Sequence, residues 1–206
     1  MRLGIFGGTF DPIHNGHLVA AVNARHDVGL DRVLIMPAHV PWQKVGHRAV
    51  TPAADRLAMV AAAVTDVDGL EASDLEVRRG GWSYTADTVE ALAVAQPAAG
   101  LFVILGADAV AGLGTWERAE TIRALASLVV VNRPGAGAGA VAVPPGWRGV
   151  TIEIPALDLS STDLRARAAA GRPLDYLVPP GAIRYLRERG LYAGGHPDEP
   201  HPRPAP

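Results

Sequence analysis

The 206-residue sequence predicts an α/β fold, in which helices cover both faces of a doubly wound parallel sheet and a small helical piece follows near the C-terminal end. Two observations predict it. Short, continuous apolar runs alternate with longer segments of helical periodicity, and such runs are typical of parallel strands buried on both faces. Apolar residues also make up 49% of the chain and aromatic residues only 5%, so the expected core is mostly aliphatic.

Six segments are predicted as strands because they are short, apolar and bounded by glycine or by helical patterns. They are residues 3–6, 32–37, 70–77, 101–105, 128–131 and 150–154. The third is predicted from a rough period-two alternation rather than from a continuous apolar run. The first and fourth run directly into Gly7 and Gly106, where the backbone can turn sharply.

Six segments carry apolar residues at helical spacing, and they are residues 15–28, 51–65, 85–96, 115–126, 161–170 and 180–189. Thr51 and Thr115 are the expected N-caps of two of these helices, and Pro52 suits a first helical position. Strands that alternate with helices in this way predict a Rossmann-like arrangement. Ligands of such sheets bind outside the carboxyl ends of the strands, so residues that follow strands are the first candidates for a site.

One domain is expected over residues 1–192. Residues 135–146 are rich in Gly, Ala and Pro and are predicted to form a flexible surface insert. Residues 193–206 are rich in Pro and are predicted to be a disordered tail, because they suit neither a helix nor a central strand.

Composition excludes several classes of protein. The net charge of −2 offers no basic field for nucleic acid. The absence of cysteine excludes disulfides, iron–sulfur clusters, cysteine-bound zinc and thiol catalysis. We find neither a signal peptide nor an apolar stretch of the roughly 20 residues that a membrane helix needs. The expectation is a cytoplasmic protein without nucleic-acid or membrane partners, and a homo-oligomer stays open.

The first strand is followed by a segment suited to phosphate, GGTFDPIHNGH. Gly7 and Gly8 let a ligand approach the backbone, and the next helix points free N–H groups and a positive dipole end at the same place. His14 and His17 are three residues apart and share one helix face, which Gly16 leaves open. Two imidazoles there can donate to phosphate oxygens. A tight turn with two surface histidines and a two-histidine metal site are the alternatives.

A second segment suited to phosphate, LSSTDLR, begins the helix predicted at 161–170. Ser161 and Thr162 are good N-caps, and Asp163 suits the first turn. Arg165 lies one turn further and can reach back as a fork-shaped phosphate clamp. An ordinary capped helix explains the same residues equally well.

Three further residues follow strands or begin helices. Lys44 is the only lysine and follows the second strand, where its compact ammonium suits phosphate, although a solvated loop lysine is the alternative. Asp108 follows a buried strand and either accepts from ribose hydroxyls or caps a helix. Trp116 begins a predicted helix and is either a core residue or a stacking surface for a planar ring.

These motifs together resemble a known family. GGTFDPIHNGH looks like the longer form of the H-x-G-H signature of nucleotidyltransferases, as found in nicotinate mononucleotide adenylyltransferases. WSYTADT, GAD followed by Trp116, and LSSTDLR are similar to further motifs of that family and occur in the expected order over residues 1–192. Many relatives have Pro-His before the loop lysine, whereas this chain has Trp42-Gln43. Trp42 would either cover the site or hold the loop in a resting position.

The resemblance implies adenylyl transfer from ATP to nicotinate mononucleotide, giving deamido-NAD and pyrophosphate in NAD biosynthesis. The catalytic residues that it implies are His14, His17, Lys44 and Arg165. The implied ATP ligands are Gly7, Gly8, Thr9, Phe10, His14, His17, Gly106, Asp108, Arg133, Ser160, Ser161, Thr162 and Arg165. The implied ligands of nicotinate mononucleotide are Thr9, Lys44, Tyr84, Thr85, Asp108 and Trp116. Mg²⁺ would accompany ATP without a protein side chain as ligand.

Individual roles follow from the same resemblance. His17 would stabilise the transferring phosphoryl group, and His14 and Arg165 would hold the polyphosphate. Thr85 would present its backbone N–H to the nicotinate carboxylate, and Trp116 would stack on the pyridine ring. Two alternatives stay open: nucleotidyl transfer to another acceptor, such as nicotinamide mononucleotide, phosphopantetheine or glycerol phosphate, and a non-catalytic nucleotide-binding module.

Overall fold

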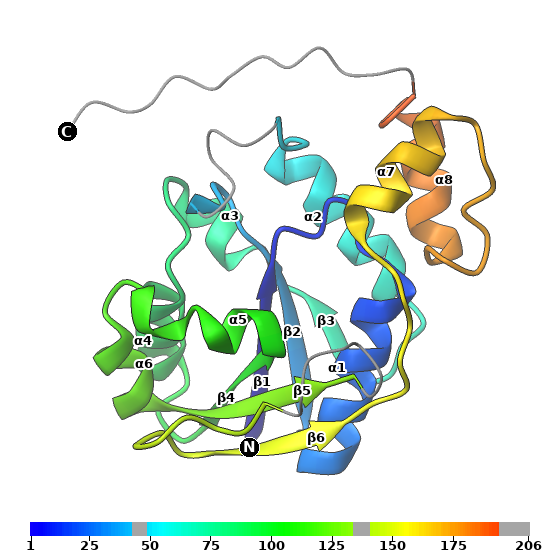
Figure 1. The fold of residues 1–206 in the computed structure, drawn as a ribbon. Coiled ribbons are helices and arrows are strands. Elements are labelled where there is room, and N and C mark those ends of the chain that lie inside the picture. Colours follow the sequence, from blue (N-terminus) through cyan, green and yellow to red (C-terminus); the bar gives the residue numbers. More distant parts are fainter. Residues whose placement is uncertain (43–48, 134–140, 194–206) are drawn as a thin grey trace.

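A computed structural model of the chain describes residues 1–42, 49–133 and 141–193. Within these residues lies a six-stranded sheet in the order β3-β2-β1-β4-β5-β6, and every neighbouring pair of strands is parallel (Figure 1). The strands are β1 (Arg2–Gly8), β2 (Arg32–Pro37), β3 (Leu70–Ala72), β4 (Gly100–Gly106), β5 (Ala126–Asn132) and β6 (Gly149–Glu153). The sheet confirms the predicted doubly wound, Rossmann-like fold.

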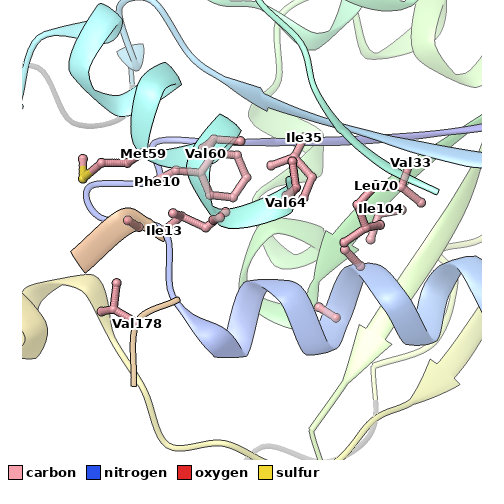
Figure 2. Packing of buried hydrophobic residues seen from close by; sticks show 14 of the residues in the cluster. Phe10, Ile13, Val33, Ile35, Met59, Val60, Val64, Leu70, Ile104 and Val178 are labelled. Atoms are coloured by element: carbon pink, nitrogen blue, oxygen red, sulfur yellow. The ribbon is translucent and has the colours of Figure 1, made fainter. Parts of the chain in front are cut away.

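Two layers of helices cover the two faces of the sheet (Figure 1). One layer contains α1 (Asn15–Val28), α2 (Ala53–Val64), α7 (Ser161–Ala169) and α8 (Pro180–Glu188), and the other contains α4 (Thr85–Ala95), α5 (Ala107–Ala111) and α6 (Ala119–Leu125). In β2, Val33 and Ile35 belong to the first core cluster, part of which Figure 2 shows, whereas Leu34 and Met36 belong to the second. None of the helices that the structure describes is long and apolar enough to span a membrane.

Strands β1 and β4, where the strand order reverses, separate toward their carboxyl ends. They pair with each other only as far as Ile5 and Val103. Beyond these residues β1 stays paired with β2 up to Gly8, and β4 stays paired with β5 up to Gly106. The ends of the two strands therefore bound an opening at the point of the sheet where ligands of doubly wound folds bind.

The C-terminal helical piece is fastened to α2. Helix α8 packs against α2, and a Cβ atom at Gly181 would lie 2.2 Å from the carbonyl oxygen of Ala62. Only glycine permits this approach of the two helices. Tyr185 donates its hydroxyl to Asp55 Oδ1 at 2.8 Å, and Arg189 Nε lies 3.4 Å from the same oxygen.

The prediction of a strand over residues 70–77 is correct for the first three residues and wrong for the rest. Strand β3 ends at Ala72, and a short helix, α3 (Leu75–Arg79), follows. As the edge strand, β3 pairs only with three residues of β2. In this helix Glu76 is buried while Leu75 and Val77 are only partly buried, so the apolar alternation of the sequence does not mark the buried side. Glu76 accepts a hydrogen bond of 2.7 Å from Thr88.

The helix predicted to begin at Thr115 begins instead at Ala119, as α6. Thr115 is the last residue of a 3-10 turn, η2 (Leu113–Thr115), and so is not an N-cap. Arg118 has a left-handed φ of 49°, which prevents a continuous helix through this position. The interruption leaves Trp116 in an extended conformation between the turn and the helix.

The start of α2 also differs from the prediction. Its N-cap is Pro52 rather than Thr51. The carbonyl of Thr51 accepts a hydrogen bond of 2.7 Å from the guanidinium of Arg56, which is only 1% exposed. A buried arginine thus binds the chain ahead of its own helix, while none of the described side chains caps the free N–H groups of the first turn.

The insert and the tail lie partly outside the described residues, which leave out 134–140 and 194–206. Val141, in the described part of the insert, is held by Asn132 at the end of β5. The Nδ2 of Asn132 donates to the carbonyl of Val141 at 2.9 Å, and its Oδ1 accepts the N–H of Val141 at 3.2 Å. The chain is therefore anchored where the described part of the insert begins.

Gly181→Ala tests the contact between α8 and α2. The added methyl group meets backbone rather than a flexible side chain, so we expect the free energy of unfolding to fall by about 2 kcal/mol. Gly114→Ala is the matched control, because no atom lies within 4 Å of the Cβ it would add. Urea denaturation measures both. Equal stabilities of the two variants would contradict the proposed close packing.

Candidate active site

A pocket opens where β1 and β4 diverge. It is lined by the ends of both strands, by the start of α4 and by the segment between η2 and α6. Of the residues predicted from sequence, it brings together Gly7, Gly8, Thr9, Tyr84, Thr85, Gly106 and Trp116. The glycine segment suited to phosphate and the residues implied for the pyridine ring therefore share one pocket.

His14 and His17 stack on each other at the start of α1. Their ring centroids lie 3.7 Å apart, with an interplanar angle of 25°. His14 is the extended N-cap residue, and its backbone N–H donates to Nδ1 of His17 at 3.2 Å. Since Nδ1 of His17 accepts this bond, the neutral ring carries its proton on Nε2, which is then its only donor.

Both histidines are held in the neutral form. Burial lowers the pKa of His14 to about 4, and the charge of Arg133 contributes to the shift. Burial also lowers the pKa of His17 well below its usual range, and His14 and Arg133 add to this effect. Arg133, exposed after the end of β5, is thus close enough to act on both rings. The positive surroundings favour an anionic ligand over a metal cation.

Neighbouring residues pack closely around the histidine pair. A Cβ atom at Gly16 would lie 3.1 Å from two atoms of the His14 ring, so glycine is needed there. Phe10 packs edge-on against His17, with centroids 5.0 Å apart, and is buried in the first core cluster. Because the side chain of Phe10 is buried, only its backbone could make the predicted contact with ATP.

Among the described residues, Nδ1 of His14 is buried without a hydrogen-bond partner, which is unusual in a folded protein.

Side chains at the start of α7 donate hydrogen bonds to the segment that precedes α1. Arg165 donates through Nη1 to the carbonyl of Asp11 at 2.7 Å and through Nη2 to Thr162 Oγ1 at 3.2 Å. Ser161 donates its hydroxyl to the carbonyl of Pro12 at 2.9 Å. The two segments predicted to suit phosphate therefore lie side by side.

Ser160, rather than Ser161 or Thr162, is the N-cap of α7. Its backbone is extended, and its hydroxyl accepts the backbone N–H of Asp163 at 3.1 Å. Three consecutive hydroxyl residues can each cap a helix, and only the backbone conformation decides among them. Because Ser160 takes the cap, the hydroxyl of Ser161 is available to bind the segment before α1.

The other side of the pocket has aromatic walls and a helix terminus. Thr85 is the first residue of α4, and Tyr84 precedes it in an extended conformation. The free N–H groups and the dipole of that terminus suit a carboxylate. Trp116 lines the pocket with a buried Nε1 that has no partner among the described residues. Trp42 also lines it, with its ring centroid 6.4 Å from that of Tyr84.

The pocket lining leaves out the described residues that the resemblance implies only for ATP, apart from the two glycines of β1 and Gly106: Phe10, His14, His17, Arg133, Ser160, Ser161, Thr162 and Arg165. Asp108 is exposed in the first turn of α5 and is not among the lining residues. Lys44 lies outside the described residues. The roles that the sequence assigns to all of the site residues stay predictions.

Two buried charged residues that no sequence observation singled out lie next to the site. Glu76 lines the pocket, and burial raises its pKa, partly offset by hydrogen bonds from Thr88 and Ser83. Arg56 donates to the carbonyls of Thr9 at 2.8 Å and His39 at 3.0 Å, which joins the chain after β1 to the chain after β2. Local patterns do not distinguish such residues from surface charges, because their partners are distant in sequence.

No cluster of three or more His, Asp or Glu side chains that could hold a metal ion occurs in the part of the chain that the structure describes. The two stacked histidines therefore lack a third ligand from those residues, and zinc sites in proteins use at least three.

Residues 5–167 match the model of the cytidylyltransferase-like family. The chain is 47% identical over 192 residues to a "Probable nicotinate-nucleotide adenylyltransferase" of Corynebacterium kroppenstedtii, covering 93% of this chain and 90% of the relative. It is also 47% identical over 189 residues to a protein of the same name from Streptomyces coelicolor, covering 91% and 99%.

Solved structures share the fold. The nicotinic acid mononucleotide adenylyltransferase of Plasmodium falciparum, complexed with NaAD, superposes with a TM-score of 0.74 at 17% identity, covering 93% of this chain and 97% of that one. The structural match at this low identity shows only the fold, whereas the sequence matches also show the family. Since relatives at this level of identity span nearly the whole chain and share one name, the chain belongs to the nicotinate-nucleotide adenylyltransferase family, within the cytidylyltransferase-like proteins.

Proposed function

We propose that the protein transfers the adenylyl group of ATP to nicotinate mononucleotide, giving deamido-NAD and pyrophosphate in NAD biosynthesis. The observation that carries the proposal is that a stacked, neutral histidine pair lies beside a pocket that has aromatic walls and a helix terminus. Phe6 joins the two, because it lines the pocket and its ring centroid lies 6.2 Å from that of His17. The names of the curated relatives support it. We also propose a cytoplasmic location and small-molecule partners only, with the oligomeric state open.

The chemistry requires no protein nucleophile. The phosphate of nicotinate mononucleotide is already an anion at neutral pH. One of its oxygens attacks the α-phosphorus of ATP in line, and the new P–O bond forms as the bond to pyrophosphate breaks. The protein then contributes positioning and stabilisation of charge.

The histidine pair and the start of α7 would bind the triphosphate. His17 would donate from Nε2 to the transferring phosphoryl group, while His14 and Arg165 hold the remaining phosphates. The negative charge of the triphosphate raises the pKa of both histidines, which opposes the effect of burial. Lys44 and Arg133 complete the set of cations in the proposal.

Mg²⁺ would enter with ATP. The described residues contain no cluster that could hold it, so its ligands would be phosphate oxygens and water, which Mg²⁺ accepts readily. The Mg²⁺ ion would neutralise part of the negative charge of the ATP phosphates.

The pocket would bind the nicotinate mononucleotide. The backbone N–H of Thr85, at the positive end of α4, would bind the nicotinate carboxylate, and Trp116 would stack on the pyridine ring. Asp108 would accept from ribose hydroxyls. An amide in place of the carboxylate would lose the attraction of the helix terminus, which favours the acid over nicotinamide mononucleotide.

Pyrophosphate release tests the function. Purified protein with ATP and Mg²⁺ is expected to turn over nicotinate mononucleotide at least about tenfold faster than nicotinamide mononucleotide, because only the acid gains a charge-assisted bond at Thr85. Equal use of both would keep adenylyl transfer and contradict the basis of selectivity. No release with either, together with ATP binding, would favour the non-catalytic nucleotide-binding module.

His17→Ala tests the donor in the transition state. Removing one such donor is expected to lower kcat by about two orders of magnitude. His26→Ala is the control, because His26 is exposed in the last turn of the same helix. Steady-state kinetics compare the two variants. A decrease in kcat of less than threefold for His17→Ala would contradict the role of His17 as a donor to the transferring phosphoryl group.

The pH dependence of stability tests the burial of His14. Its pKa is 6.5 in the unfolded chain and about 4 in the folded one. The unfolded state therefore takes up the proton first, so the contribution of neutral His14 to stability is present above pH 6.5 and is lost as the pH falls toward 4. His14→Asn keeps a good N-cap and removes this titration.

Urea denaturation across this pH range is the measurement. Wild type is expected to lose roughly 2 kcal/mol more than His14→Asn. Parallel pH profiles for the two proteins would show that His14 is not held neutral by the fold.

A further inference from the structure

Tyr192 joins the end of the described chain to the segment that precedes α1. Its hydroxyl donates to Oδ1 of Asp11 at 2.7 Å, across 181 positions of sequence. Tyr192 is 8% exposed and Asp11 is 1% exposed. Tyr192 does not line the pocket, and none of the roles proposed above uses either residue.

The backbone bends back after α8 to bring the phenol to this position. The N–H of Leu191 donates to the carbonyl of Leu186 at 2.9 Å. Tyr192 then adopts a left-handed φ of 63°, which is unfavourable for a residue with a Cβ atom. The buried ring and its hydrogen bond must offset that cost, so the position of the phenol is specified by its contacts rather than by local preference.

The hydrogen bond between Tyr192 and Asp11 is of a strong type. Burial raises the pKa of Tyr192, and the charge of the Asp11 carboxylate adds to the shift. The phenol therefore remains a neutral donor at physiological pH, and its acceptor is a carboxylate. Such charge-assisted bonds are roughly twice as strong as bonds between neutral groups.

Asp11 is held from two directions. Helix α7 binds the backbone of this segment, through Arg165 to the carbonyl of Asp11 and through Ser161 to the carbonyl of Pro12. Tyr192 binds the side chain. His14 follows only three residues later, so a shift of the Asp11 side chain is transmitted directly to the start of α1. Without the phenol, a buried carboxylate loses a donor and the segment can move to satisfy it.

We propose that Tyr192 is a positioning residue for adenylyl transfer. By holding the Asp11 carboxylate it fixes the segment that places His14 and His17 for the triphosphate. The proposal rests on the proposed function. It predicts that the hydroxyl of Tyr192 acts on ATP rather than on the mononucleotide, because His14 follows Asp11 by only three residues and neither Asp11 nor Tyr192 lines the pocket.

Tyr192→Phe removes the hydroxyl and keeps the ring. It is expected to lower kcat by about tenfold and to raise the KM for ATP, with the KM for nicotinate mononucleotide within about twofold of wild type. Tyr185→Phe is the matched control, because it removes a hydroxyl that donates to the Asp55 carboxylate at 2.8 Å between α8 and α2. It is expected to leave all three constants within about twofold.

The control separates positioning from stability. Both variants are measured at a temperature where thermal unfolding shows them fully folded. Equal kinetics of the two variants, or equal changes in both KM values for Tyr192→Phe, would overturn the proposal.

A mutant cycle tests whether the hydroxyl acts through Asp11. Asp11→Asn keeps an oxygen that accepts from the phenol but removes its charge, so Tyr192→Phe is expected to have less than half its effect on log kcat in that background. An undiminished effect would overturn the route through Asp11.

If wild type does not turn over nicotinate mononucleotide, the proposed function fails by itself. The positioning role is then decided by the affinity for ATP, measured by calorimetry. Tyr192→Phe must weaken binding and Tyr185→Phe must not. Equal affinities would overturn the proposal.

Discussion

The divergence of β1 and β4 is the constraint on which the rest of the structure depends. The two strands stop pairing after Ile5 and Val103. The chain then leaves β1 for α1 on one face of the sheet and leaves β4 for α5 on the other. A strand pair whose continuations go to opposite faces leaves a crevice between them, and the pocket forms there. The glycine segment after β1, the start of α4 and Trp116 all line this crevice.

The segments at the crevice have no ladder of strand hydrogen bonds and need other donors and acceptors. Distant side chains supply them. Arg56 of α2 binds the carbonyl of Thr9, and Arg165 and Ser161 of α7 bind those of Asp11 and Pro12. The side chain of Asn15 donates to a carbonyl in the chain between α7 and α8 at 2.7 Å. Helix α7 and the chain that follows it therefore hold the segment that carries the histidines.

Helices and strands with one strong local sequence pattern were predictable from the sequence. The predicted bounds of α1 and β2 coincide with the observed ones, because a long helical segment that ends before the left-handed Gly29 and a continuous apolar run that ends at Pro37 each allow one interpretation. Glu76 and Arg56 were not predictable. A charged residue becomes buried only when other groups satisfy it, as Thr88 does for Glu76 and the carbonyls of Thr9 and His39 do for Arg56.

The sequence by itself determined the alternation of strands and helices, the aliphatic core, the chemical groups offered to a phosphate and the family to which they belong. These depend on periodicity, on caps and on motif order, which residues within a few turns of one another decide. Only the tertiary structure decided the strand order, the opening between β1 and β4, the stacking of His14 on His17 and the contact of Tyr192 with Asp11. The physical reason is that these depend on groups brought together by packing across the sheet, and their free energy is gained only when the whole chain is folded.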